Sequence, residues 1–268
     1  MTDPTVQICT IASGSGGNSV YLRFGEDEIL IDAGISCRRI TDGLKALGTS
    51  PENLRAVFIT HEHSDHICGL ETLLKKWPIP LHMVEASAKN GFASGKYPHA
   101  AAGVITHPPL FCVQIGNLTV RSFATPHDAA ASVGYVIKDG NPDHTTAVAT
   151  DIGHITPDIE EALTGVPNLI LESNHNEAML LCGSYPYELK RRILSDRGHL
   201  SNDCAAVFLK RLADAGARRV LLAHLSKENN LPDLALATAM EALEGCNIRV
   251  AVAAPSEITV LPGASELC

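Results

Sequence analysis

Short apolar runs rich in β-branched residues alternate with amphipathic segments along the whole chain. Apolar runs and period-two alternation predict strands, and apolar positions spaced three and four apart predict helices. The expected strands are residues 7–11, 19–24, 28–31, 56–60, 80–84, 118–124, 132–137, 146–150, 168–172, 219–223, 249–251 and 257–260. The expected helices are residues 37–47, 68–76, 157–163, 187–195, 203–215 and 232–243. Helices follow strands throughout, which predicts a layered α/β architecture.

Glycine and proline divide these segments. Residues 13–18 read SGSGGN, which predicts a tight turn between the first two strands, where the backbone can approach a ligand closely. Because no GK[ST] follows, this is not a Walker nucleotide-binding loop. Ser15 and Asn18 are therefore candidate substrate contacts at this turn. Residues 91–109 show little pattern and are expected to form a surface loop.

Length and composition narrow the class of protein. The chain has 268 residues, of which 45% are hydrophobic and 19% charged, as expected for a globular protein with a substantial core. We expect a single domain over residues 1–268. No apolar run approaches about 18 residues, which argues against a membrane span. The first residues lack a basic segment followed by a long apolar one, so we expect a cytoplasmic location.

Cysteine and charge change this picture little. The eight cysteines contain no CxxC pair, and a chain of this length needs no disulfide framework, so reduced thiols are expected. The formal charge of −9 argues against broad, nonspecific binding of nucleic acid. A basic stretch that includes Lys190, Arg191 and Arg197 is the local exception. It is either a solvated helix face or a patch that contacts a phosphate backbone.

The strongest chemical signal is ITHEHSDH at residues 59–66, directly after an apolar run. Histidine and carboxylate side chains together suit zinc, manganese or iron. In an extended segment His61 and His63 point the same way, because side chains alternate. Asp65 and His66 then lie on the following turn and can face a second ion. Such a cluster after a buried strand is not typical of an ordinary polar loop.

Further ligand-type residues follow other expected strands. His127, Asp151 and His224 each lie at or just after a strand end, where layered α/β folds place their sites. His107 is a rival to His127, but it lies in the loosely patterned region, so His127 is preferred. With the first motif, the count is seven ligands. That number suits two ions that share one bridging carboxylate and keep an open position.

These motifs carry a family resemblance. LIDAG, the HxHxDH motif and the later His, Asp and His resemble the metallo-β-lactamase superfamily over nearly the whole chain. IASGSGGNSVYL, LESNHNEAML, GHLSN and AHLSKENN are similar to its YycJ/WalJ-like branch. The resemblance implies an α/β fold (α+β in some schemes), a four-layer αββα sandwich. It also implies a metal-dependent 5′-exonuclease or phosphodiesterase, related to ribonuclease Z and to a cyclic-phosphate phosphodiesterase. The long tRNA-gripping arm of ribonuclease Z and the large β-CASP insert are not evident.

The same resemblance assigns the ligands to two metals. For the first metal it implies His61, His63 and His127. For the second it implies Asp65, His66 and His224, and Asp151 bridges the two ions. Asp65 thereby also counts among the catalytic residues.

Residues around the expected metals also match the family pattern. Asp32 resembles an acid that orients a ligand histidine. His199 resembles the histidine that ribonuclease Z places near the scissile phosphate, and Glu172 resembles its supporting acid. The alternative for His199 is a loop histidine before a helix cap at residue 201 or 202. Asn174 is a candidate substrate contact.

The remaining histidines carry weaker signals. By sequence context, two lie near the site and are either part of it or packing residues, namely His154 and His175. Four others are expected to be surface or structural residues, namely His82, His99, His107 and His144.

Three functions compete at this stage. The first is a phosphodiesterase that uses a hydroxide bridging two divalent ions (Zn, Mn or Fe). It would degrade nucleic acid from the 5′ end, and DNA is expected as the substrate more than RNA. The second is a small-molecule metallohydrolase that acts on a cyclic phosphodiester, lactone or thioester, which the acidic charge favours somewhat. The third is a metal-binding regulatory protein without turnover. The sequence does not predict the oligomeric state.

Overall fold

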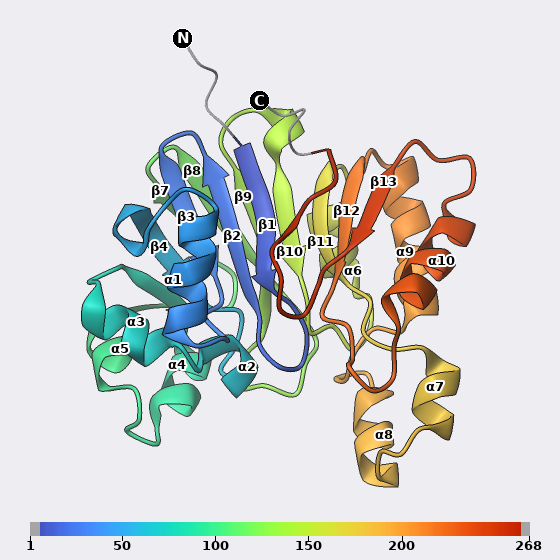
Figure 1. Ribbon diagram of the computed structural model, residues 1–268, viewed down its shortest axis with the longest axis horizontal. Helices are drawn as coiled ribbons and strands as arrows, with labels where there is room; N and C mark the ends of the chain where they lie inside the picture. Colours follow the sequence, from blue (N-terminus) through green and yellow to red (C-terminus); the bar gives the residue numbers. More distant parts are fainter. Residues whose placement is uncertain (1–5, 264–268) are drawn as a thin grey trace.

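Two seven-stranded mixed sheets face each other in the computed structural model, which describes residues 6–263 (Figure 1). The first sheet runs in the order β14-β1-β2-β3-β4-β5-β6. These strands are Thr259–Val260, Val6–Ala12, Ser19–Phe24, Asp27–Ile31, Leu54–Phe58, Leu81–Val84 and Val104–His107. The second sheet runs β13-β12-β11-β10-β9-β8-β7. These are Arg249–Val252, Arg219–Ala223, Asn168–Glu172, Thr146–Ala149, Val133–Lys138, Leu118–Ala124 and Cys112–Ile115.

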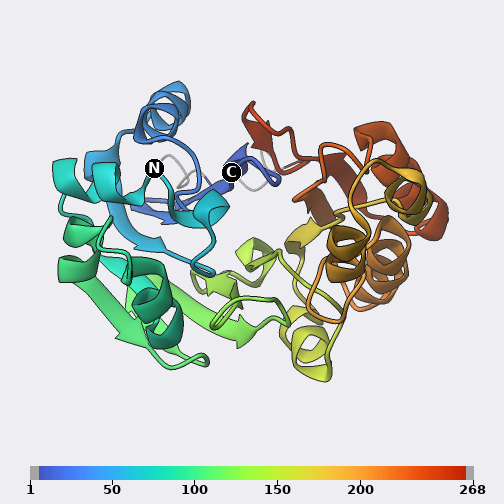
Figure 2. The same cartoon turned by 90° about the horizontal axis from the view of Figure 1, so that it is seen from below.

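Helices cover the outer faces of the two sheets. The first five are α1 (Cys37–Ala46), α2 (Ser64–Ile67), α3 (Leu70–Lys76), α4 (Glu85–Phe92) and α5 (Pro98–Gly103). The next five are α6 (Pro157–Leu163), α7 (Glu177–Cys182), α8 (Tyr187–Ile193), α9 (Asn202–Asp214) and α10 (Pro232–Ala242). The blue α1 and the orange-red α9 and α10 lie on opposite outer sides in both views (Figures 1 and 2). None of the helices in residues 6–263 combines the length and apolar character needed to cross a membrane.

Apolar side chains fill three layers between these elements. Ile8, Phe58, Tyr135 and Leu221 belong to the cluster between the two sheets. A second cluster lies between the first sheet and α1 and α3, and a third between the second sheet and α6, α9 and α10. The alternation of inward and outward positions along each strand produces this layering. The predicted four-layer αββα sandwich is confirmed.

The expectation of a surface loop over residues 91–109 is wrong. The segment contains the end of α4, all of α5 and strand β6, which pairs in parallel with β5 from Leu81↔Val104 to Val84↔His107. Pro98 occupies the first turn of α5, where proline is tolerated, and Ala100 is fully buried. The pairing of β6 depends on β5, more than 20 residues earlier, so local pattern does not reveal it. Strand β7 and the short helices α2 and α7 were also not predicted.

Parallel strands bring several chain ends to one edge of the sandwich. In the first sheet β3, β4, β5 and β6 are parallel, and in the second β10, β11, β12 and β13 are parallel. The loops that follow parallel strands therefore meet at a common edge, which is where α/β sheets place ligands. Helices α7 and α8 project beyond this edge (Figure 1).

The cysteines in the described residues are all free thiols: Cys9, Cys37, Cys68, Cys112, Cys182, Cys204 and Cys246. Cys268 lies outside the described residues.

Candidate metal centre

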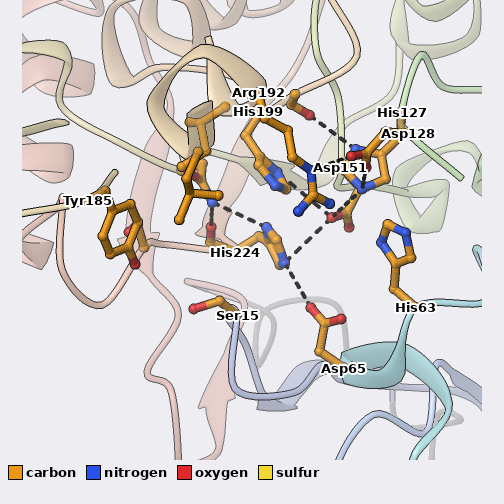
Figure 3. A pocket seen from close by; sticks show the side chains of 15 residues that line it. Ser15, His63, Asp65, His127, Asp128, Asp151, Tyr185, Arg192, His199 and His224 are labelled. Carbon is orange, nitrogen blue, oxygen red and sulfur yellow. Dashed lines mark hydrogen bonds and ion pairs between the residues drawn. The ribbon is translucent and has the colours of Figure 1, made fainter. Parts of the chain in front are cut away.

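The seven ligand-type residues converge at this edge of the sandwich. His61 follows β4, His63 caps α2, and Asp65 and His66 belong to α2 itself. The second sheet contributes its residues from the loops after β8, β10 and β12, namely His127, Asp151 and His224. In the close-up, His63, His127, Asp151, His224 and Asp65 surround a common space (Figure 3). The structure therefore brings together every residue that the sequence assigned to the metals.

Their donor atoms form overlapping groups around Asp151. Donor atoms within 4.8 Å of one another define four such groups: His61, His63 and His127; Asp65, His66 and His224; His61, His66 and Asp151; and Asp151, Glu172, His199 and His224. One Asp151 oxygen, Oδ2, lies 3.4 Å from His66 Nε2. The other, Oδ1, lies 3.7 Å from His127 Nε2 and 3.5 Å from His224 Nε2. Asp151 thus lies between the two groups of histidines.

The unpaired atoms of this cluster test whether it suits a metal. Among the seven ligand-type residues, three buried atoms have no hydrogen-bond partner within residues 6–263: His61 Nε2, Asp151 Oδ2 and His224 Nε2. Buried polar atoms without partners cost free energy, and a bound cation removes that cost. Imidazole nitrogens and carboxylate oxygens are a donor set for zinc, manganese and iron. The residues present therefore fit divalent metal ions.

Four of the histidines are each held by a protein partner at Nδ1. Nδ1 of His66 donates to Asp32 Oδ2 at 2.7 Å, and Nδ1 of His127 donates to the Gly198 carbonyl at 3.1 Å. Nδ1 of His61 lies 3.1 Å from Thr60 Oγ1, and Nδ1 of His224 lies 3.0 Å from a Glu172 oxygen. Because each Nδ1 has a protein partner, each Nε2 is left to face the cluster, the usual arrangement in metal sites.

Positive φ angles mark the same residues. Within residues 6–263 the non-glycine residues with positive φ are Asp32 (63°), Asp151 (59°) and His224 (57°). Each lies one or two residues beyond a strand end, after β3, β10 and β12. The left-handed region is unfavourable for residues with a Cβ and is concentrated at functional sites. The turn directs these side chains into the cluster as the backbone leaves the sheet.

The glycine-rich turn and the LIDAG segment hold α2 in place. Asn18 N donates to the Asp65 carbonyl at 2.8 Å, and Gly34 N donates to the Asn18 carbonyl at 2.8 Å. A Cβ at Gly34 would lie 1.6 Å from the Asp65 carbonyl oxygen, so only glycine fits there. Asn18 Nδ2 also lies 3.2 Å from His66 Nε2. Asn18 therefore packs against the ligand helix and does not line the cavity, whereas the exposed Ser15 does.

The charges inside the cluster are strongly coupled. Burial alone would raise the pKa of Asp151, but His224, His66 and the other rings hold it well below its usual range. Burial and the neighbouring His66 lower the pKa of His61 well below its usual value. Burial alone would lower the pKa of His66 and of His224, but the neighbouring carboxylates raise both. Because metal binds neutral imidazole, a cation at this centre would displace protons from these two rings.

Glu172 connects His199 to the cluster. Its Oε1 accepts from His199 Nδ1 at 2.8 Å and lies 3.0 Å from His224 Nδ1, and its Oε2 accepts from Ile152 N at 2.8 Å. Burial opposes ionisation of Glu172, but His199 and His224 lower its pKa to about 2. Ser201 caps α9 by accepting from Cys204 N, so the ring of His199 is not needed for the cap. His199 instead lines the cavity.

A cavity of about 230 Å³ opens over the cluster. Besides the expected residues, its lining includes Asp128, Tyr185 and Arg192, which the sequence analysis did not assign (Figure 3). Arg192 Nε donates to Asp128 Oδ2, and Asp128 Oδ1 lies 3.2 Å from His127 Nε2. Asp128 directly follows a ligand and Arg192 lies in the basic stretch, so both had a weak signal. Tyr185 had none, because the fold of the α7–α8 connection decides its position.

The candidate substrate contacts separate into two groups. Asn174 lines the cavity, and its Nδ2 donates to the His224 carbonyl at 2.8 Å. Lys190, Arg191 and Arg197 do not line it. The amine of Lys190 donates to the Leu181 and Gly183 carbonyls at 2.7 Å each, and Arg197 donates to the His127 carbonyl at 2.9 and 2.7 Å. The exposed Arg191 lies 3.6 Å from Glu188.

Glu62 inside the first motif has a structural position that the sequence did not reveal. Its Oε1 accepts from Ala130 N at 2.7 Å and from Asn90 Nδ2 at 2.8 Å, and its Oε2 accepts from Ser87 Oγ at 2.7 Å. These bonds connect the loop of His61 and His63 to α4 and to the loop after His127.

His107 lies away from the cluster and pairs with another histidine. Its Nε2 lies 2.9 Å from His82 Nδ1, and the two rings stack with centroids 5.2 Å apart. Phe58 and Phe111 stack on the outer faces of the pair, at 4.7 and 4.1 Å. The choice of His127 over His107 therefore agrees with the geometry.

The His82–His107 pair predicts an acid-sensitive stability. Burial and the proximity of His107 lower the pKa of His82 from 6.5 to about 4. Between these values the unfolded chain binds a proton that the folded chain does not, so stability falls as the pH drops from 6.5 to 4. The expected slope for this ring is up to about 1.4 kcal/mol per pH unit. Urea unfolding from pH 7 to 4 measures it, and His82→Phe reduces the slope; an unchanged slope contradicts the prediction.

Comparison with known proteins agrees with this architecture. A protein-family model described as "Beta-lactamase superfamily domain" matches residues 27–225. Exodeoxyribonuclease WalJ of Streptococcus pneumoniae is 35% identical over 246 residues, covering 90% of each chain. Exodeoxyribonuclease YycJ of Bacillus anthracis is 33% identical over 243 residues, covering 87% of this chain and 88% of its own. Zn(2+)-bound PqqB from Methylobacterium extorquens shares the fold with a TM-score of 0.69 at 17% identity, over 94% and 99% of the chains.

The chain therefore belongs to the metallo-β-lactamase superfamily and to its WalJ/YycJ branch, as its motifs predicted. It is a metal-dependent hydrolase, which confirms the enzyme class expected from the sequence.

Proposed function

We propose that this hydrolase is a dinuclear phosphodiesterase that removes nucleotides from the 5′ end of nucleic acid, DNA in preference to RNA. The observation that carries the proposal is the pair of ligand groups that meet at Asp151, with the His199–Glu172 pair beside them on one cavity. The names of the WalJ and YycJ relatives, both exodeoxyribonucleases, support DNA as the substrate.

Each ligand has a proposed place in this centre. One ion would be held by His61, His63 and His127, and the other by Asp65, His66 and His224, with Asp151 close to both. When bound, two divalent ions such as zinc, manganese or iron supply positive charge to the phosphate oxygens and lower the pKa of water. Asp32 holds His66 in the orientation that this binding needs.

The chain itself supplies the proton for the leaving group. Glu172 accepts from His199 Nδ1 and so directs His199 Nε2 toward the cavity. Hydrolysis at a 5′ end breaks the bond between phosphorus and O3′ of the terminal nucleotide. His199 Nε2 donates a proton to that O3′ oxygen as the bond breaks. The water proton that is released remains with solvent or the carboxylates.

Arg192 is the cation that the chain presents to the substrate phosphate. The cavity is otherwise lined by the carboxylates of Asp65, Asp128 and Asp151, so Arg192 offsets part of their charge. Its side chain is 54% exposed, which leaves guanidinium N–H groups free to contact a phosphate oxygen while Nε stays on Asp128.

Arg192→Ala is expected to raise the KM for an oligonucleotide about tenfold and to reduce its dependence on salt concentration, because one phosphate contact is lost. The effect on bis-p-nitrophenyl phosphate is smaller, since that ester carries a single negative charge. Steady-state kinetics at several salt concentrations measure both. Arg191→Ala is the matched comparison, because Arg191 is adjacent in sequence but outside the cavity. A larger effect for Arg191→Ala contradicts the assignment.

The function is tested with purified protein loaded with Mn²⁺ or with Zn²⁺. Its substrates are 5′-labelled duplex DNA, the matching RNA and bis-p-nitrophenyl phosphate, and elemental analysis measures the metal content. Stepwise release of 5′ nucleotides, faster from DNA, supports the proposal. Hydrolysis of the small ester without any cleavage of oligonucleotides supports the small-molecule alternative instead. Full metal occupancy without hydrolysis of any substrate overturns the proposal.

A further inference from the structure

A second cavity, of about 410 Å³, adjoins the catalytic one, and His199 lines both. It lies between the loop after β10, the end of α8 and the first turns of α9. Its lining includes Ile155, His175, Leu194, His199, Val207 and Arg211. Neither the proposed metal ligands nor the proposed proton transfer needs this space.

His175 is the unexplained polar group of this second cavity. Its side chain is buried, with the residue only 1% exposed, yet neither ring nitrogen has a hydrogen-bond partner within residues 6–263. The backbone is fixed, because the His175 carbonyl accepts from Asn202 N at 2.8 Å and the residue forms a bridge with Ser201. Burial lowers the pKa of His175, so the ring is neutral and offers one donor and one acceptor. A ligand with a complementary polar edge would satisfy one of these nitrogens.

The other walls of the cavity are suited to a flat apolar ring. Leu194 and Val207 are 44% and 65% exposed, although they are large aliphatic side chains. Together with Ile155 they give the cavity apolar surface beside the polar His175. Apolar walls with a few fixed polar groups are typical of sites for small heterocycles. A nucleobase has both features, two apolar faces and a hydrogen-bonding edge.

The position of His199 indicates which nucleobase belongs here. In the proposed reaction His199 donates its proton to O3′ of the terminal nucleotide, so that nucleotide lies on the His199 side of the scissile phosphate. His199 lines the second cavity as well as the catalytic one. We propose that it holds the base of the departing 5′-terminal nucleotide, and that His175 binds the polar edge of this base. This inference rests on the proposed 5′-nuclease function.

The test compares two oligonucleotides that differ only in their 5′-terminal residue, one with a normal base and one abasic. With wild-type protein the normal end is cleaved with a kcat/KM about tenfold higher, because base binding is lost at the abasic end. Val207→Trp fills the cavity from an exposed position and is expected to reduce this ratio to near one. His175→Phe removes the polar contacts and also reduces it. Met240→Trp, an exposed apolar position on α10, is the matched control and retains the tenfold ratio.

The outcomes separate this inference from the function on which it rests. Equal cleavage of normal and abasic ends by the wild type overturns the base site but leaves the nuclease function standing. An unchanged ratio in both Val207→Trp and His175→Phe also overturns the base site. Hydrolysis of bis-p-nitrophenyl phosphate without cleavage of either oligonucleotide overturns both proposals. If Met240→Trp also loses the preference for the normal end over the abasic end, the loss does not arise from this cavity, and the result counts against the base site.

Discussion

Asp151→Ala is expected to abolish hydrolysis and to lower the bound metal in the same protein. The Asp151 carboxylate lies within 3.4–3.7 Å of Nε2 of His66, His127 and His224, so it contacts both ligand groups at once. Its removal takes away the carboxylate that the two proposed ion sites share and leaves Asp65 as the one acidic ligand of the proposed set. We expect turnover to fall by more than the roughly 10–100-fold that is typical when only a supporting residue is lost. Steady-state rates and elemental analysis of the same preparation measure the two effects.

The control for this variant is Asp158→Ala, because Asp158 is an exposed acid on α6 outside the cluster. It is expected to retain full metal content and rate. Circular dichroism shows whether Asp151→Ala still folds. A folded Asp151→Ala protein that keeps both its metal and its rate would exclude Asp151 as a ligand shared by two ions.

His199→Ala is expected to keep the metal but lose rate. His199 belongs to a donor group with Asp151, Glu172 and His224, but it is not one of the seven ligands proposed for the two ions. In the variant Glu172 retains its contact with His224 and its bond from Ile152 N. Loss of a positioned proton donor typically lowers the rate about 10²–10⁴-fold. We therefore expect kcat on DNA to fall within this range at unchanged metal content and thermal stability.

A comparison of two leaving groups shows whether His199 acts as a proton donor. p-Nitrophenolate leaves without protonation, whereas O3′ of a nucleotide does not. The deficit of His199→Ala should therefore be much smaller on bis-p-nitrophenyl phosphate than on DNA. Glu172→Gln alters the partner of His199 Nδ1, and it should therefore change the pH profile of the rate on DNA. Equal deficits on both substrates would assign His199 to phosphate binding, and wild-type rates on DNA would remove it from the mechanism.

The local signals in the sequence were sufficient for the ligand cluster. His61, His63, Asp65 and His66 lie within six residues, so their proximity follows from chain connectivity alone. His127, Asp151 and His224 are distant in sequence, but each follows a recognisable strand, and loops after strands gather at a sheet edge. The αββα architecture was likewise readable from the order of strands and helices together with the motif resemblance.

The surroundings of the cluster could not be read in this way. Arg192 lies in the cavity, while its neighbours Lys190 and Arg191 do not, because the direction of a helix face depends on how α8 packs. Residues 91–109 contain β6 only because β5 offers it a pairing edge. The unpaired ring of His175 becomes visible only when burial and hydrogen-bond partners are known for every neighbour.

The sequence by itself determined the fold class, the superfamily and the candidate metal ligands, because these depend on local patterning and on motifs that follow recognisable strands. Only the tertiary structure decided which basic residue lines the cavity, how Asp32 and Glu172 contact their histidines, and that a second cavity adjoins His199. These features arise from contacts between residues tens of positions apart, and their geometry is set by the packing of the two sheets and their helices.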